Sequence, residues 1–170
     1  KHRDLILEAI HDSIYQDALF NRIIKDFIVQ GGEHDVDIAA REKAFPMEPK
    51  PRLPAEFNTN AFHKIGALGA GRDDNLDKSS FLNQIYFVVG KPVTAAELKV
   101  LEEKKAFRFT KAQRKEYLKN GGLPRLDNDY TVFGEIYEGI TVIRYISQLK
   151  TNDLDYPLNP VHFHLSVINE

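Results

Sequence analysis

The segment from Phe20 to Gly32, FNRIIKDFIVQGG, restricts the fold of this chain more than any other stretch. Residues Phe20 to Ile24 and Phe27 to Gln30 form two strand-like runs, separated by the polar pair Lys25-Asp26 and closed by two glycines. A period of two is typical of strands, and a short polar break between two such runs is typical of a hairpin. We therefore predict two short strands joined by a tight turn.

Arg22 is the unusual residue of this hairpin, because arginine is rarely buried without a partner. Its neighbours at two-residue spacing, Phe20 and Ile24, are apolar, so we expect the guanidinium to emerge beside aromatic and amide groups of the second strand. Two interpretations remain open on spacing alone. Arg22 either belongs to the wall of a ligand site or forms a structural ion pair with Asp26 or Glu33.

The composition indicates one globular domain without a strongly charged surface. The chain has 170 residues, of which 42% are hydrophobic and 28% charged, and its formal net charge is -2. We expect a single domain spanning residues 1–170. The charges are spread along the chain, so we expect no nucleic-acid partner. No apolar stretch approaches the roughly 20 residues of a membrane span, and the lack of cysteine excludes disulfides and thiol catalysis.

The first half of the chain predicts one helix and two more strands. Apolar residues at steps of three and four predict a helix from Asp4 to Ser13. Residues Glu33 to Thr59 are charged and rich in proline, and we expect a long surface connection there without a regular helix or central strand. The segments Lys64–Ala70 and Asn83–Val89 are strand-like, and we expect them to pair as neighbours.

The second half predicts two helices followed by strands. Thr94-Ala-Ala-Glu97 and Thr110-Lys-Ala-Gln113 both fit the capping box that begins a helix. Strands are predicted at Thr131–Tyr137 and Val161–Ile168, with a helix from Gly139 to Ser147 between them. Many short strands with a few helices indicate a mainly β fold, either a barrel or a sandwich capped by helices.

Three polar or glycine-rich segments resemble functional motifs, but each is better explained as structural. Glu33 to Asp37 offers three carboxylates and an imidazole, yet it lacks the spacing of a calcium loop. His162 and His164 share one face of the last predicted strand, and the apolar residues of the other face place them outward. The glycines of Gly66–Gly71 lack the lysine and hydroxyl residue of a phosphate loop. We therefore expect no metal site and no cofactor.

One motif and several separate blocks match a known family. The motif is Phe20-x-Arg22-x-Ile24-x-x-Phe27-Ile28-x-Gln30-Gly31-Gly32. The blocks that follow it in order are Gly66-Ala-Leu68, Gln84-Ile-Tyr86-Phe87, Leu126-Asp127, Thr131-Val-Phe-Gly-Glu135 and Gly139. These residues resemble the cyclophilins, which are peptidyl-prolyl cis-trans isomerases, and the resemblance extends over the whole chain.

The resemblance implies a set of site residues. Arg22 corresponds to the catalytic arginine of the family, with Gln30 beside it. The implied substrate-binding residues are Phe27, Ile28, Gly71, Arg72, Gln84, Tyr86, Leu126 and Tyr130. Substitutions at five positions distinguish this chain from the family.

Tyr86 and Tyr130 stand where the family commonly has phenylalanine and histidine, which keeps an aromatic wall. Gly71-Arg72 replaces an alanine-asparagine pair whose backbone holds the peptide. Arg125 replaces the tryptophan associated with tight cyclosporin binding, so such binding is not expected.

The resemblance also implies a closed antiparallel β-barrel capped by helices. Residues 94–120 form a helical insertion relative to the minimal family, similar to an elaboration in some bacterial members. We expect it to lengthen the substrate groove or to bind a partner. The family has a strand hairpin before its first helix, and because this sequence begins at that helix, we expect those strands upstream.

The activity implied is catalysis of rotation about X-Pro bonds, which assists protein folding. The partners implied are proline-containing polypeptides, with no cofactor and a monomeric protein. The alternative is a proline-binding scaffold or chaperone module with weak catalysis, whose inserted helices form the interface. The compartment stays open: removal of a signal segment would imply the periplasm or cell envelope, and otherwise the cytoplasm.

Overall fold

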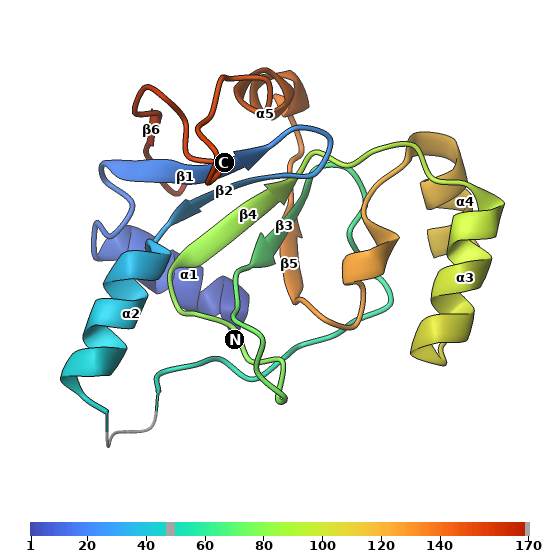
Figure 1. Cartoon of the computed structure of the whole chain (residues 1–170), viewed down its shortest axis with the longest axis horizontal. Helices are drawn as coiled ribbons and strands as arrows, with labels where there is room; N and C mark the ends of the chain where they lie inside the picture. The colour runs from blue at the N-terminus through green and yellow to red at the C-terminus, as the bar shows by residue number, and fades with distance from the viewer. Residues whose placement is uncertain (47–49, 169–170) are drawn as a thin grey trace.

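The computed structural model describes residues 1–46 and 50–168 and contains a six-stranded antiparallel sheet. The strands are β1 (Ala18–Ile24), β2 (Ile28–Gly32), β3 (Ala67–Ala70), β4 (Gln84–Val88), β5 (Val132–Glu135) and β6 (His162–Phe163). Their order is β5-β3-β4-β2-β1-β6, so β4 and β2 are central (Figure 1). The strand-like segments predicted at 64–70, 83–89 and 131–137 contain β3, β4 and β5, and β3 pairs with β4 as expected.

Five α-helices and a short 3-10 helix surround this sheet in the described residues. They are α1 (His2–His11), α2 (Asp35–Ala44), α3 (Ala95–Lys105), α4 (Lys111–Asn120), η1 (Pro124–Leu126) and α5 (Ile140–Ile146). The helices predicted at Asp4–Ser13 and Gly139–Ser147 correspond to α1 and α5. None of the helices within 1–46 and 50–168 is long and apolar enough to cross a membrane.

The β1–β2 hairpin is confirmed, but the prediction that Phe20 and Arg22 share a face was wrong. Arg22 pairs with Gln30 across the hairpin, whereas Phe20 pairs with Gly31. The strand β1 therefore has one extra residue, Asn21, between these two pairs, and this irregularity is a β-bulge. A bulge changes the alternation of side chains, so Phe20 enters the core while Arg22 is exposed.

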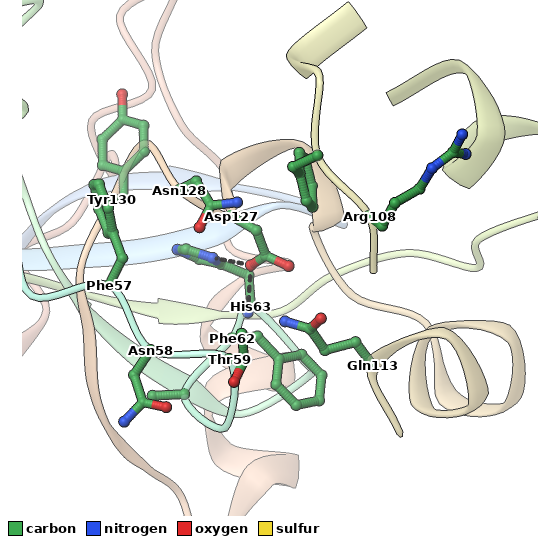
Figure 2. A pocket seen from close by; sticks show the side chains of 12 residues that line it. Phe57, Asn58, Thr59, Phe62, His63, Arg108, Gln113, Asp127, Asn128 and Tyr130 are labelled. Carbon is green, nitrogen blue, oxygen red and sulfur yellow. Dashed lines mark hydrogen bonds and ion pairs between the residues drawn. The ribbon is translucent and has the colours of Figure 1, made fainter. Parts of the chain in front are cut away.

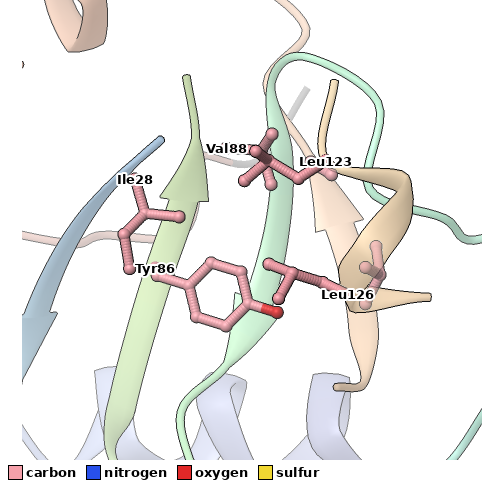
Figure 3. Close-up of a cluster of buried hydrophobic side chains, with 7 residues drawn as sticks. Ile28, Tyr86, Val88, Leu123 and Leu126 are labelled. Atoms are coloured by element: carbon pink, nitrogen blue, oxygen red, sulfur yellow. The ribbon is translucent and has the colours of Figure 1, made fainter. Parts of the chain in front are cut away.

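The central strands send alternate side chains to opposite apolar layers. On β4, Tyr86 and Val88 belong to one layer, and Phe87 packs in the other. The layer of Tyr86 also contains Ile28 from β2 and, around η1, Leu123 and Leu126 (Figure 3). This layer underlies the candidate site described below.

The two predicted capping-box helices are confirmed as α3 and α4. The hydroxyls of Thr94 and Thr110 each accept from the backbone N–H three residues later, and both capping boxes are complete. The pair stands at the edge of the molecule opposite α2 (Figure 1). Its own buried cluster consists of Val93, Leu98, Phe109 and Tyr117.

The prediction that residues 33–59 contain no helix was wrong, because α2 occupies Asp35–Ala44. The prolines of this stretch begin at Pro46, so they end the helix instead of interrupting it. Acidic residues in its first turn and basic residues in its last turn also suit the helix dipole. Residues 47–49, including one of the prolines, lie outside the described residues.

The last predicted strand, Val161–Ile168, was too long, because only His162 and Phe163 form β6. They pair with Leu19 and Ala18 of β1. The expected orientation of the histidines is confirmed, since His162 and His164 are both exposed. Alternation therefore continues along this segment without a complete ladder of backbone hydrogen bonds.

Candidate active site

A pocket of about 240 Å³ lies over the apolar layer of Tyr86. Its lining contains every site residue predicted from the sequence except Gln84, and it adds Arg125. The lining residues are Arg22, Phe27, Ile28, Gln30, Gly71, Arg72, Tyr86, Arg125, Leu126 and Tyr130. They come from β1, β2, β4, η1 and neighbouring loops, so the sheet brings distant parts of the chain together.

The floor of the pocket is apolar and its walls are aromatic. Ile28, Tyr86 and Leu126 are only 5%, 2% and 6% exposed, and Figure 3 shows the Tyr86 ring directed toward Leu126. Phe27 and Tyr130 pack against the same cluster. The rings of Tyr86 and Tyr130 meet edge to face with their centroids 6.1 Å apart. A slot of this character suits a small apolar ring.

Gly69 allows the Tyr86 ring to lie across β3. The two residues are cross-strand partners. A Cβ atom at position 69 would lie 2.3 Å from Cζ of the tyrosine, closer than atoms can approach. A glycine at this position is therefore part of what positions the pocket floor.

The Tyr86 hydroxyl begins a chain of four buried polar groups. It lies 2.7 Å from Nε2 of His63. The Nδ1 atom of His63 lies 2.7 Å from Oδ1 of Asp127 (Figure 2). Tyr117 of α4 donates to the other oxygen of Asp127 at 2.6 Å. A carboxylate oxygen only accepts, so Nδ1 of His63 carries a proton and donates to Asp127, and in that tautomer Nε2 accepts from the Tyr86 hydroxyl. These hydrogen bonds link the pocket floor to helix α4.

Burial sets the protonation of the two tyrosines in this chain of groups. Burial raises the pKa of Tyr86 well above its usual value, and Tyr130 and Asp127 raise it further. Burial also raises the pKa of Tyr117, and Asp127 adds to that effect. Both hydroxyls therefore remain protonated donors at neutral pH.

A small cavity of about 40 Å³ adjoins His63 and Asp127 (Figure 2).

Arg22 lies at the exposed rim of the pocket, with 44% of its side chain accessible. Its Nε donates to Oδ2 of Asp155 at 3.4 Å, and the Asp155 side chain is 39% exposed. An exposed pair of this kind contributes only about 0–1 kcal/mol. Neither acid expected from the sequence is the partner: within the described residues Asp26 forms no ion pair with Arg22, and Glu33 pairs with Arg41.

Gln30 and Gln84 occupy different places. Gln30 lines the pocket as the cross-strand partner of Arg22, although no hydrogen bond joins these two side chains in the part of the chain described here. Gln84 lies behind Gly71, and its amide donates to Asp35 at 2.6 Å. A Cβ atom at position 71 would lie 2.1 Å from Oε1 of Gln84, which explains why glycine occupies that position.

Two further arginines stack on the aromatic walls. The guanidinium of Arg72 lies 4.7 Å from the centroid of Tyr130 and donates to the Asp129 carbonyl at 2.6 Å. Arg125 lies 4.4 Å from the ring centroid of Phe27 and is exposed at the edge of the pocket. The side chain of Arg72 therefore holds the wall and its loop, whereas Arg125 remains available at the edge.

Metal ligation has no support within residues 1–46 and 50–168, where no cluster of three or more His, Asp or Glu side chains could hold an ion. In the segment from Glu33 to Asp37, two of the acids pair with Arg41 and Gln84 instead. His162 contacts Asp17 at 2.7 Å.

The sequence analysis missed His63 and did not place Arg125 in the site. His63 lies in no motif of the sequence. Tyr86 nevertheless predicts a polar neighbour, because a buried tyrosine hydroxyl usually needs a hydrogen-bond partner. Which polar residue supplied that partner depended on the fold. Arg125 was identified only as the replacement of a tryptophan, although it lines the pocket.

The fold and the pocket define a class of β-sheet protein with an apolar, aromatic-walled slot and an arginine at its rim. The family model described as "Cyclophilin type peptidyl-prolyl cis-trans isomerase/CLD" matches residues 1–165. The chain belongs to this cyclophilin-type family, and its function is that of a peptidyl-prolyl cis-trans isomerase.

Related proteins and structures agree with that assignment. A Staphylococcus aureus protein provisionally named a peptidyl-prolyl cis-trans isomerase is 31% identical over 148 residues, which cover 86% of this chain and 70% of the relative. A Staphylococcus haemolyticus protein with the same name is 29% identical over 147 residues, covering 86% and 69%. A Cryptosporidium parvum cyclophilin-type isomerase, crystallised in the presence of the dipeptide Ala-Pro, shares the fold with a TM-score of 0.65. The identity is 14%, and the match covers 100% of this chain and 85% of that one.

Proposed function

We propose that the pocket catalyses rotation about X-Pro bonds of client polypeptides, with Arg22 as the catalytic residue. The rotation has a barrier of roughly 18–20 kcal/mol, because the nitrogen lone pair is delocalised into the carbonyl. A hydrogen bond donated to that nitrogen becomes available as the bond twists and the nitrogen pyramidalises, so it stabilises the transition state more than either ground state. Arg22 suits this role because its guanidinium is permanently charged and rigid.

The observation that carries the proposal is the position of this cation at the rim of an apolar slot. Ile28, Tyr86 and Leu126 would hold the proline ring, while Phe27 and Tyr130 flank it. Fixing the ring lets the other side of the bond rotate. An apolar floor also excludes water, which strengthens the hydrogen bond from Arg22. No bond breaks and no proton is transferred, so the reaction needs neither a nucleophile nor a cofactor.

The remaining predicted residues have supporting roles in this proposal. Gln30 lies directly across the hairpin from Arg22 and would orient it and contact the substrate carbonyl. The backbone at Gly71-Arg72 would hold the residue before the proline. The Gly71 amide already donates to the Gln84 carbonyl at 2.8 Å, so Arg72 is the better placed of the two. Gln84 would support the floor from behind Gly71 without touching the substrate.

The alternative is a proline-binding scaffold with weak catalysis. It is supported by the occupied amide of Gly71, which reduces the backbone groups available to align a peptide. The charge of Arg22 argues against it, because a binding site for a proline ring has no need of a guanidinium beside the imide nitrogen.

The substitution Arg22→Ala separates these two functions. We expect kcat/KM for an X-Pro peptide, measured by exchange NMR, to fall by about 10²–10³, the usual effect of removing a transition-state donor. The control is Asp155→Asn, which removes the ion-pair partner at a position with φ of 65° that asparagine tolerates. If the parent binds the peptide without accelerating isomerisation, the scaffold function holds instead.

We further propose that residues 1–170 belong to one domain, with residues 94–120 as an insertion, and that the sheet of this domain closes into a barrel. In the described chain β5 and β6 are the edge strands, so closure requires further strands between them. Unpaired edges are prone to aggregation. Slow amide exchange on the outer edges of β5 and β6 would support closure, and fast exchange there would contradict it.

A further inference from the structure

An apolar groove lies beside the proposed proline pocket, between α3 and the η1 segment. Its volume is about 370 Å³, within the roughly 300–1,000 Å³ of most ligand pockets. Lys91 and Glu97 also line it, and they pair with each other at 3.6 Å. The apolar lining residues are Val93, Ala96, Val100, Leu101, Leu123 and Pro124.

Hydrogen bonds and apolar packing hold the two sides of the groove together. Lys105, at the end of α3, donates to the backbone carbonyls of Arg125 at 2.5 Å and Asp127 at 3.0 Å, which ties α3 to η1. Leu98 on α3 is fully buried in the cluster shared with α4. The side of α3 that carries Leu98 is already packed. Val100 faces the groove instead, and because it is 47% exposed it is accessible to a ligand.

Arg125 makes the groove continuous with the pocket. It lines both cavities, and its guanidinium stacks on the Phe27 wall of the pocket. Leu123 on the groove side and Leu126 on the pocket side belong to one buried cluster. A chain that leaves the pocket past Arg125 therefore enters the groove directly.

The proposed peptide-binding positions and the groove follow one another along β4. The Gly71 N–H donates to the carbonyl of Gln84 at the start of this strand, and Tyr86 lies at its middle. The Phe27 carbonyl accepts from the two residues just beyond the strand, and Lys91 of the groove comes next. A peptide with its proline over Tyr86 and its preceding residue beside Gly71 must leave toward the groove.

We propose that the groove binds an apolar side chain of the same client, two or three residues after the proline. An extended chain rises roughly 3.3 Å per residue, so the second and third residues after the proline lie roughly 7–10 Å beyond it. Arg125, which lines both cavities, separates the pocket from the groove. The inference rests on the proposed function, because that function sets the direction of the peptide. We assign the groove to the client polypeptide because the groove is continuous with the proline pocket, which already binds that client. A separate partner protein would gain nothing from this continuity.

The test is a set of peptides, each with one X-Pro bond, measured by exchange NMR. In each peptide one position carries either leucine or asparagine, and the position is scanned from three residues before the proline to four after it. Burial of a leucine side chain favours binding by about tenfold or more. We expect kcat/KM to be about tenfold higher for leucine at the second or third following residue, and equal for the two residues elsewhere.

Two matched variants locate the preference. Val100→Asp places a charge in the groove, and the ratio between leucine and asparagine peptides should fall to about one. Leu118→Asp makes the same kind of change at a 46% exposed residue of α4 that does not line the groove, and it should leave the ratio unchanged. Sedimentation of the parent and both variants records the oligomeric state.

Several results would overturn the inference. They are a ratio of one at every position, a preference for leucine before the proline, and a preference that survives Val100→Asp. A dimer that dissociates in Val100→Asp alone would instead identify the groove as a contact between copies. These failures are distinct from failure of the proposed function, because they are read only when the parent accelerates isomerisation. Failure of the proposed function would appear as a parent that accelerates no peptide in the set, or as an unchanged rate in Arg22→Ala.

Discussion

Tyr86→Phe is the sharpest test of how the pocket floor is built. Phenylalanine is the common family residue at the matching position, and its ring would fit over Gly69 as the tyrosine does, so sterics alone predict no loss of stability. The hydrogen-bond chain predicts a loss. His63 is 1% exposed, and its Nε2 accepts from the Tyr86 hydroxyl at 2.7 Å. The substitution leaves this buried acceptor without its partner.

The expected magnitude follows from that unsatisfied group. A buried polar atom that loses its partner destabilises a fold by about 1–3 kcal/mol, which is a substantial part of a total stability of about 5–15 kcal/mol. His63→Leu should be worse, at about 3–5 kcal/mol, because it also removes a donor from the buried carboxylate of Asp127. The two substitutions break one shared hydrogen bond, so the double variant should be less destabilised than their sum by about 1 kcal/mol.

Urea unfolding measures these differences, and exchange NMR measures activity. Tyr86→Phe should shift the urea midpoint without changing the slope, while kcat/KM stays close to that of the parent because the wall remains aromatic. A Tyr86→Phe protein at least as stable as the parent would refute the reasoning. Strict additivity of the two substitutions would show that the contact between Tyr86 and His63 contributes nothing.

Three further predictions concern other parts of the molecule. The backbone N–H and ring of His2 hold the pKa of Glu56 at about 2, below its usual 4.5, so Glu56 stabilises the fold above pH 4.5 and loses that contribution as the pH falls toward 2. Because this side chain is 38% exposed, we expect about 1 kcal/mol, and Glu56→Gln should flatten the acid dependence of the urea midpoint. Gly71→Ala should destabilise the protein by about 1–3 kcal/mol through its contact with Gln84, and adding Gln84→Ala should recover part of the loss if that contact is the cause. The pH profile of kcat/KM should be flat from about pH 7 to 9, because Arg22 stays charged and no proton moves, whereas a bell-shaped profile would indicate proton transfer.

The part of the site that lies in one hairpin could be predicted from the sequence. Arg22, Phe27, Ile28 and Gln30 fall within nine consecutive positions, and strand periodicity with a matching motif relates them locally. The bulge beside Asn21 could not be predicted, because the alternation of residue types does not record an extra residue in one strand. The bulge places Phe20 on a different face of β1 from Arg22, but the hairpin residues predicted for the site still line the pocket.

Contacts between distant residues account for most of what was missed. The partner of Arg22 is Asp155, which is 133 positions away, whereas the acids considered from the sequence were near neighbours. The extent of β6 was also misjudged, since a strand needs a partner strand as well as alternation. The missed helix α2 had a different cause: the prolines were counted for the whole stretch, although they begin only after Ala44.

The pocket floor shows why one substitution in this family has meaning only with its surroundings. A tyrosine at position 86 adds a hydroxyl that must be satisfied where it is buried, and His63 and Asp127 satisfy it. Asp127 in turn accepts from Tyr117, a residue of helix α4. The α3–α4 pair is therefore joined to the pocket by hydrogen bonds as well as by the groove along α3. A change in α4 that removes the Tyr117 hydroxyl should loosen the floor of the pocket, even though Tyr117 lines no part of it.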